Sequence, residues 1–215
     1  MGDSEHGNKI RHYYDDYKGY YEEVVNYRVK FRDVFSMKHF YFMLHEWLVE
    51  EEWIYQTTPF IDALFPETFY LKREDQTMGV ESFIHWRLKK YAFSKGPAKT
   101  WRGDMFVYFH LLHLKDIEVL HKGVKYKANS GEVEVKVRIN LVAEKFAVWK
   151  DNAIMKHFIN VLWKRFLYKD KERFRNQFYR EGYRFQEAMK TFFKLVTFMP
   201  EPELQRFYYK RDFER

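Results

Sequence analysis

The chain has 215 residues, with 38 Lys and Arg against 31 Asp and Glu, and its formal net charge is +7. A chain of this length suffices for one ordinary domain or two small ones, and it can bury about 70% of its unfolded surface. Cysteine is absent, which excludes disulfides, thiolate catalysis and Cys-ligated zinc or iron–sulfur sites. No apolar run approaches the roughly 18 residues of a membrane span, and the polar start is not typical of a signal peptide. We therefore expect a soluble, cytoplasmic protein, and the many Lys, Arg and Glu residues hint at a heat-adapted source.

The positive charge is concentrated in the last third of the chain. Residues 1–144 contain 21 Lys and Arg against 22 Asp and Glu, whereas residues 145–215 contain 17 against 9. Any surface that attracts anionic partners is therefore expected near the carboxy terminus.

In chain order, residues 1–12 are expected to be a disordered lead. A first strand is predicted over 21–32, followed by a helix over 37–53 with Ser36 as its N-cap. Further strands are predicted at 67–74, 80–93, 105–115, 116–121 and 124–127, with turns at Lys122-Gly123 and at 129–131. The segment 105–115 is apolar at both alternating sets of positions, which is typical of a central strand covered on both faces.

The clearest element is a strand over 131–141. Its apolar residues alternate with polar ones, which places one set on each face of a sheet; the apolar set is Val133, Val135, Val137, Ile139 and Leu141. Two amphipathic helices are then predicted over 151–168 and 171–196, and residues 200–215 are expected to form a charged aromatic tail.

This order of elements predicts an α+β fold with a single domain over residues 13–199. We expect a curved antiparallel sheet of about five to seven strands and an early helix after the first strand. Two long C-terminal helices are expected to pack on one face of this sheet. The same order is similar to the helix-grip arrangement of START-like lipid and small-molecule binders, although that arrangement has one C-terminal helix. The resemblance implies a cavity for a hydrophobic ligand, lined by Phe109, Val133, Val135, Val137, Ile139 and Phe185.

Residue patterns typical of catalysis are missing. His45-Glu46 resembles the start of a zinc-protease motif, but Val49 stands where that motif needs a second histidine. The acidic pairs, such as Asp15-Asp16, are adjacent, so they indicate solvated faces more than an acid/base dyad. No phosphate-binding glycine loop or nucleophile motif occurs. An enzyme is therefore not the expectation, and no catalytic residue, metal site or cofactor is predicted.

The composition points most directly to a non-catalytic interaction or assembly protein. The sequence is 21% aromatic, and Tyr, Trp and Arg are typical of contact surfaces. Its predicted contact residues for a protein partner, a second copy of the chain or nucleic acid are Arg173, Arg180, Arg184, Lys190, Phe207, Tyr208 and Tyr209. A nucleic-acid partner is expected if exposed rings mix with the basic residues on one face. Tyr168, Tyr179 and Tyr183 are candidates for this mixture, because they lie off the apolar stripe of the helix. The same basic face could also be a solvated surface above a phenylalanine core.

Overall fold

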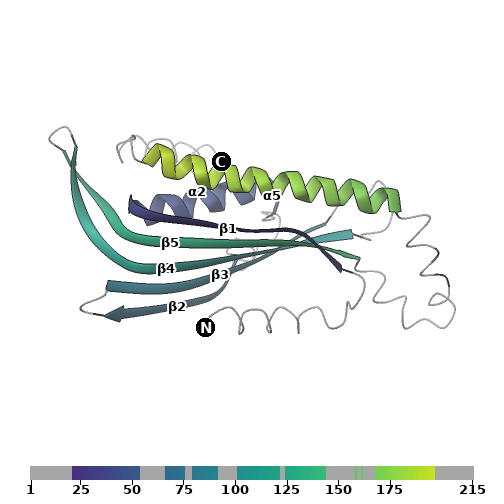
Figure 1. The fold of residues 1–215 in the computed structure, drawn as a ribbon, viewed down its shortest axis with the longest axis horizontal. Coiled ribbons are helices and arrows are strands. Elements are labelled where there is room, and N and C mark those ends of the chain that lie inside the picture. Colours follow the sequence, from purple (N-terminus) through teal and green to yellow (C-terminus); the bar gives the residue numbers. More distant parts are fainter. Residues whose placement is uncertain are drawn as a thin grey trace, which may run out of the picture. The chain divides into compact units, whose positions relative to one another are not determined.

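The computed structural model describes residues 21–53, 66–75, 79–91, 101–121, 124–143 and 168–196, with the single positions 158 and 161. These residues form an α+β fold with one antiparallel five-stranded sheet in the order β1-β5-β4-β3-β2 (Figure 1). The elements are β1 (Tyr21–Phe35), α2 (Met37–Glu50), β2 (Glu67–Asp75), β3 (Gly79–Tyr91), β4 (Trp101–His121), β5 (Val124–Ala143) and α5 (Tyr168–Val196). The sheet is open, because β1 and β2 are its two edges.

The chain divides into two compact units. The first unit comprises Met1–Asn26, Leu88–Phe106 and Arg138–Gly182, and the second comprises Tyr27–Arg87, Val107–Val137 and Tyr183–Arg215. β1, β3, β4, β5 and α5 each contribute a segment to both units. The expected single domain over residues 13–199 stays a prediction.

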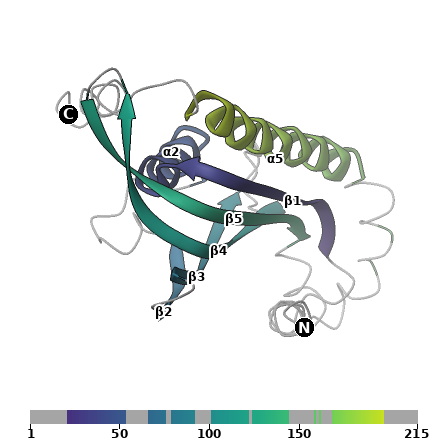
Figure 2. The same ribbon diagram turned by 60° about the vertical axis from the view of Figure 1, so that its left-hand side comes forward.

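In the second unit, α2 and the last part of α5 lie on one face of the sheet (Figure 2). Phe40, Leu44 and Leu48 recur at helical spacing on α2 and are fully buried. The ring of Phe40 lies 5.2 Å from that of Phe192 on α5 and 6.5 Å from that of Phe109 on β4. The predicted early helix is therefore confirmed, and it ends at Glu50.

In the first unit, α5 packs closely against β4, β5 and β1 at two glycines. A Cβ atom on Gly103 would lie 2.7 Å from Cζ of Phe178, and a Cβ on Gly182 would lie 2.9 Å from both Ile139 and Val25. Real Cβ atoms do not approach other atoms this closely, so both positions depend on the absence of a side chain. These contacts fix which face of α5 is turned to the sheet in this unit.

The central strands agree with their patterns. All five apolar residues of the predicted 131–141 strand are buried, with exposures of at most 1%. β4 is the third of the five strands, as expected for a segment that is apolar on both sides.

The predicted turn at 129–131 is wrong. β4 and β5 are each continuous, and residues 129–131 lie within β5. His113 of β4 adopts a positive φ of 53°, and a Cβ on Gly131 would lie 2.9 Å from the carbonyl oxygen of Leu112. Glycine is therefore needed at an irregularity inside the hairpin, where no turn occurs.

The prediction of two long C-terminal helices is also wrong for the residues described here, which contain one, α5. Of the expected helix over 151–168, only positions 158, 161 and 168 are described, and their side chains are exposed. The predicted lead (1–12), the turn at Lys122-Gly123 and the tail (200–215) lie outside the described residues. The tail includes the candidate contact residues Phe207, Tyr208 and Tyr209.

Candidate functional site

The residues predicted to line a cavity are packed in the core. Phe109, Val133, Val135, Val137 and Phe185 of the second unit and Ile139 of the first are at most 1% exposed. The Phe109 ring lies 4.8 Å from that of Trp86, and the Phe185 ring lies 4.7 Å from that of Trp47. Aromatic rings at these distances are in direct contact, so side chains fill the space beside Phe109 and Phe185 in the second unit.

α5 has one apolar face and one charged face. Phe174, Phe178, Phe185, Met189 and Phe192 are all buried, with exposures of at most 6%. They recur at spacings of three, four and seven residues, which places them on one side of a helix with 3.6 residues per turn. The opposite side therefore points to solvent, and the basic residues lie there.

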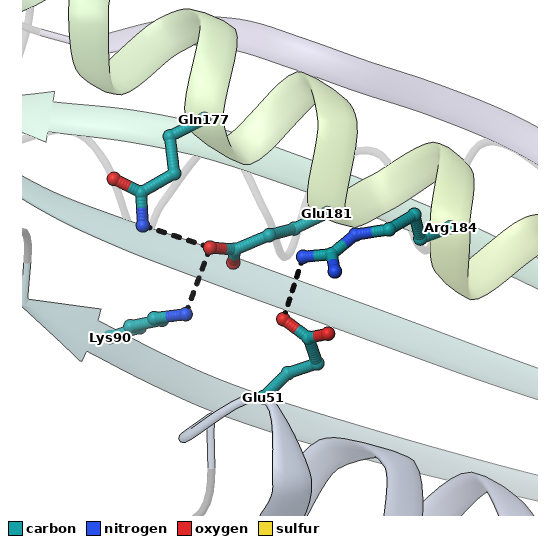
Figure 3. A network of polar contacts seen from close by, with 5 residues as sticks. All are labelled: Glu51, Lys90, Gln177, Glu181 and Arg184. Carbon is teal, nitrogen blue, oxygen red and sulfur yellow. Dashed lines mark hydrogen bonds and ion pairs between the residues drawn. The ribbon is translucent and has the colours of Figure 1, made fainter.

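A buried ion pair holds α5 in the first unit (Figure 3). Nζ of Lys90 on β3 lies 2.9 Å from Oε1 of Glu181, and Nε2 of Gln177 donates to the same oxygen at 2.9 Å. The side chains of Lys90 and Glu181 are only 6% and 5% exposed. Buried charges need a partner of opposite sign, so this pair adds a specific contact to the hydrophobic packing of α5.

Two of the predicted contact residues are engaged in local ion pairs in the second unit. Nη2 of Arg184 lies 2.8 Å from Oε2 of Glu51, at the end of α2 (Figure 3). Nζ of Lys190 lies 3.0 Å from Oε1 of Glu187, one turn before it on α5. Because acidic side chains already compensate both charges, these two residues are weaker candidates for binding an anionic partner.

The other two predicted residues are exposed and lack such compensation. Arg173 and Arg180 belong to the first unit, and within the described part of the chain neither has an ion pair or a hydrogen bond from its side chain. The same holds for Lys169, which the sequence reasoning missed. We call Lys169, Arg173 and Arg180 the cation row. At about 100° per residue, they lie within an arc of about 40° and extend about 16 Å along the helix.

In contrast to the cation row, two neighbouring basic residues of the first unit, Lys171 and Arg175, form ion pairs with acidic side chains. Nζ of Lys171 lies 2.6 Å from Oε2 of Glu22, and Nη1 of Arg175 lies 3.1 Å from Oε1 of Glu172. On α5, acidic side chains therefore compensate the basic residues on the flank that faces β1, whereas the cation row has no acidic partner among the described residues. Lys194 of the second unit is likewise exposed and has no acidic partner among the residues described.

Tyrosines lie beside the cation row. Tyr168 and Tyr179 of the first unit are 54% and 50% exposed. Eleven residues separate them, which is close to three helical turns, so they lie on the same side of α5. In the second unit, Tyr183 is partly exposed and its ring lies 6.0 Å from that of Tyr27. The mixture of rings and basic residues that the sequence left open therefore exists on the exposed face of α5.

The described residues offer little for catalysis. They contain no group of three or more His, Asp or Glu side chains that could hold a metal ion. Nδ1 of His45 lies 3.8 Å from Oε1 of Glu46, and Nε2 of His110 lies 3.1 Å from Oε1 of Glu81. Both pairs lie at partly exposed positions. In this part of the chain, no helix is long and apolar enough to span a bilayer.

Comparison with known proteins identifies no family. No protein-family model matches the sequence, and no curated protein matches it. Among solved structures, the chain is similar to the activated Cyt2Ba monomer from Bacillus thuringiensis subsp. israelensis, with 9% identity and a TM-score of 0.35. The match covers 58% of this chain and 73% of that one. A TM-score this low carries no argument about the fold or the function.

Proposed function

We propose that this protein is a non-catalytic nucleic-acid-binding protein that contacts the phosphate backbone with the exposed face of α5. The observation that carries the proposal is the cation row, in which Lys169, Arg173 and Arg180 are exposed and have no acidic partner among the described residues. Clustered Lys and Arg on one face are the electrostatic footprint of nucleic-acid binding.

The geometry of α5 favours nucleic acid over a membrane surface. A helix that lies in a membrane interface buries its apolar face among lipids. The apolar face of α5 is already buried within the protein, at Phe178 in the first unit and at Phe185 in the second. The exposed face of α5 presents basic residues and tyrosines. This combination suits a polymer with regularly spaced phosphates.

The other functions expected from the sequence have less support. The closely packed aromatic core of the second unit gives no support to a ligand cavity of the helix-grip kind. Assembly through the aromatic ends stays a prediction, because those segments lie outside the described residues. The broader expectation of an interaction protein is kept, with nucleic acid as the partner.

The test compares two charge-matched double variants by fluorescence anisotropy with a labelled oligonucleotide. Arg173→Gln/Arg180→Gln removes two charges of the cation row. Lys72→Gln/Lys125→Gln removes two charges that pair with Glu74 and Glu118 elsewhere. Two lost phosphate contacts predict binding about 25-fold weaker at about 0.1 M salt, because each contact with a single strand releases about 0.7 counterion. The control variant should bind within about twofold of the wild type.

Three results would contradict the proposal. The first is an absence of wild-type binding at low salt. The second is equal weakening in both variants, which would indicate a general charge effect. The third is binding to vesicles of phosphatidylserine and phosphatidylcholine that depends on Arg173 and Arg180 while oligonucleotide binding does not.

A further inference from the structure

The edge strand β2 of the second unit is a surface that the proposed function does not use. We infer that β2 pairs antiparallel with β2 of a second copy of this chain, about a twofold axis at Leu71. The two sheets would then continue across the contact as one sheet. This inference goes beyond the proposed function and is independent of it, because β2 contributes nothing to the cation row.

β2 is an exposed strand at the edge of the sheet (Figure 1). Within the described residues it pairs with β3 alone, and all of its residues except Leu71 are exposed. Phe69 and Tyr70 are 44% and 54% exposed. The other edge, β1, uses its apolar residues inside the second unit, where Phe31 stacks on Phe193 at 4.2 Å. An exposed edge strand with apolar residues is a template for pairing with another chain.

The part of β2 that can pair regularly begins at Phe69. The register to β3 shifts between Glu67 and Phe69, and such an irregularity interrupts regular pairing. From Phe69 to Asp75 the register to β3 is unbroken, and this segment contains no proline. A regular strand without proline presents backbone N–H and C=O groups in alternation along its open edge.

Symmetry restricts how two copies of this segment can meet. Two identical antiparallel strands related by a twofold axis must place one residue opposite its own copy. A centre at Lys72 or Arg73 places like charges opposite each other, which is destabilising. A centre at Tyr70 reaches the irregularity directly after Phe69. A centre at Leu71 extends the regular pairing from Phe69 to Arg73 on both strands and brings no like charges together.

The register centred on Leu71 also matches the side chains. It places Phe69 opposite Arg73 of the second copy and Tyr70 opposite Lys72 of the second copy. Residues two apart share a face, so each of these pairs lies on one side of the joined sheet. A cation beside an aromatic ring is attracted to it, and twofold symmetry makes each contact occur twice.

Arg73 and Lys72 are both suited to these contacts. Arg73 is exposed, and within the described part of the chain its side chain has no ion pair or hydrogen bond. Lys72 pairs with Glu74 on its own strand, and its aliphatic stem can still lie along a ring. The strand is therefore complementary to itself, which favours a second copy over an unrelated strand.

The experiment measures the monomer–dimer equilibrium of the full chain by sedimentation equilibrium. Concentrations up to about 1 mM cover the weak end of specific association, where a small edge-to-edge contact belongs. The variants are Leu71→Lys, Leu71→Glu and an equimolar mixture of the two. Leu120→Lys is the matched control, because Leu120 of β4 is an apolar residue with 69% exposure outside β2. Far-UV circular dichroism checks that each variant is folded.

The wild type is expected to dimerise. Leu71→Lys and Leu71→Glu each place like charges on the twofold axis, so each should raise the dissociation constant about fivefold or more. The mixture should recover dimers, because the new lysine then faces the new glutamate, and native mass spectrometry would identify them as heterodimers. Leu120→Lys should match the wild type.

Arg73→Glu is a second variant that leaves Leu71 in place. It removes a cation from beside Phe69 of the second copy at both symmetric positions, which should weaken dimerisation about fivefold. This variant decides the matter if the Leu71 variants do not fold.

Three results would overturn the inference. They are a wild type that stays monomeric at every concentration, Leu71 and Arg73 variants that dimerise like the wild type, and a mixture of Leu71 variants that forms no heterodimer. Arg173→Gln/Arg180→Gln should dimerise like the wild type whether or not it binds oligonucleotides, so failure of the inference and failure of the proposed function are distinguishable.

Discussion

At the scale of single residues, Lys90 and Glu181 are the buried charges that hold α5 against β3 in the first unit. Their side chains are 6% and 5% exposed and their closest atoms are 2.9 Å apart. Removal of one partner leaves the other charge buried without compensation, which typically costs about 3–5 kcal/mol. Replacement of both by apolar residues of similar size is often neutral or stabilising.

We therefore predict that Glu181→Leu lowers the free energy of unfolding by about 3–5 kcal/mol. The double variant Lys90→Met/Glu181→Leu should recover most of this loss, and urea denaturation would measure both. If the double variant is as unstable as the single one, the loss does not come from the uncompensated Lys90 charge.

The sequence could not predict this pair. Ninety-one residues separate Lys90 from Glu181 in the sequence, and charged residues are rarely fully buried unless they are paired. The valines of β5 were predictable for the opposite reason, because their alternation is local and a shift of one residue would expose all of them. Lys169 was missed although it lies four residues before Arg173, since its lack of an acidic partner depends on the folded structure.

At the scale of elements, the start of α2 depends on a residue of β5. Oδ1 of Asn129 accepts a hydrogen bond from the backbone N–H of Met37 at 3.0 Å, and its Nδ2 donates to Asp116 at 2.7 Å. Ser36 occupies the N-cap position, but its hydroxyl bonds to Nδ1 of His39 and does not cap the backbone. The sequence thus located the N-cap correctly and assigned the capping bond to the wrong residue.

This arrangement predicts different effects for the two residues. Asn129→Ala should lower the free energy of unfolding by about 0.5–2 kcal/mol, as expected for the loss of a helix cap. It should also increase hydrogen exchange at the Met37 amide. Ser36→Ala should leave exchange at that amide unchanged. Faster exchange at Met37 in Ser36→Ala alone would contradict the assignment.

Residues of β5 also explain why a turn was wrongly predicted at 129–131. Asn, Ser and Gly are typical of turns when read from the sequence alone. Here Asn129 is used for its hydrogen bonds to Met37 and Asp116, and Gly131 for a close approach to the backbone of Leu112. Both requirements come from contacts that are distant in the sequence. The second C-terminal helix was expected from a real periodicity over 151–168, most of which lies outside the described residues.

At the scale of the whole molecule, the chain carries its excess charge in its last third, and α5 presents part of that charge to solvent. Acidic side chains compensate Arg184, Lys190, Lys171 and Arg175. Among the described residues of α5 in the first unit, the cation row consists of exposed basic side chains without an acidic partner. The composition predicted a basic region, but the ion pairs of the structure are needed to show which of its basic residues have acidic partners.

The salt dependence of binding tests the central claim most directly. The logarithm of the association constant for a single-stranded oligonucleotide would be measured against the logarithm of the salt concentration, for the wild type and for Arg173→Gln/Arg180→Gln. Each phosphate contact contributes about 0.7 to the slope, so the double variant should lose about 1.4 from the wild-type slope. An unchanged slope in the variant, or wild-type binding that does not depend on salt, would contradict the account.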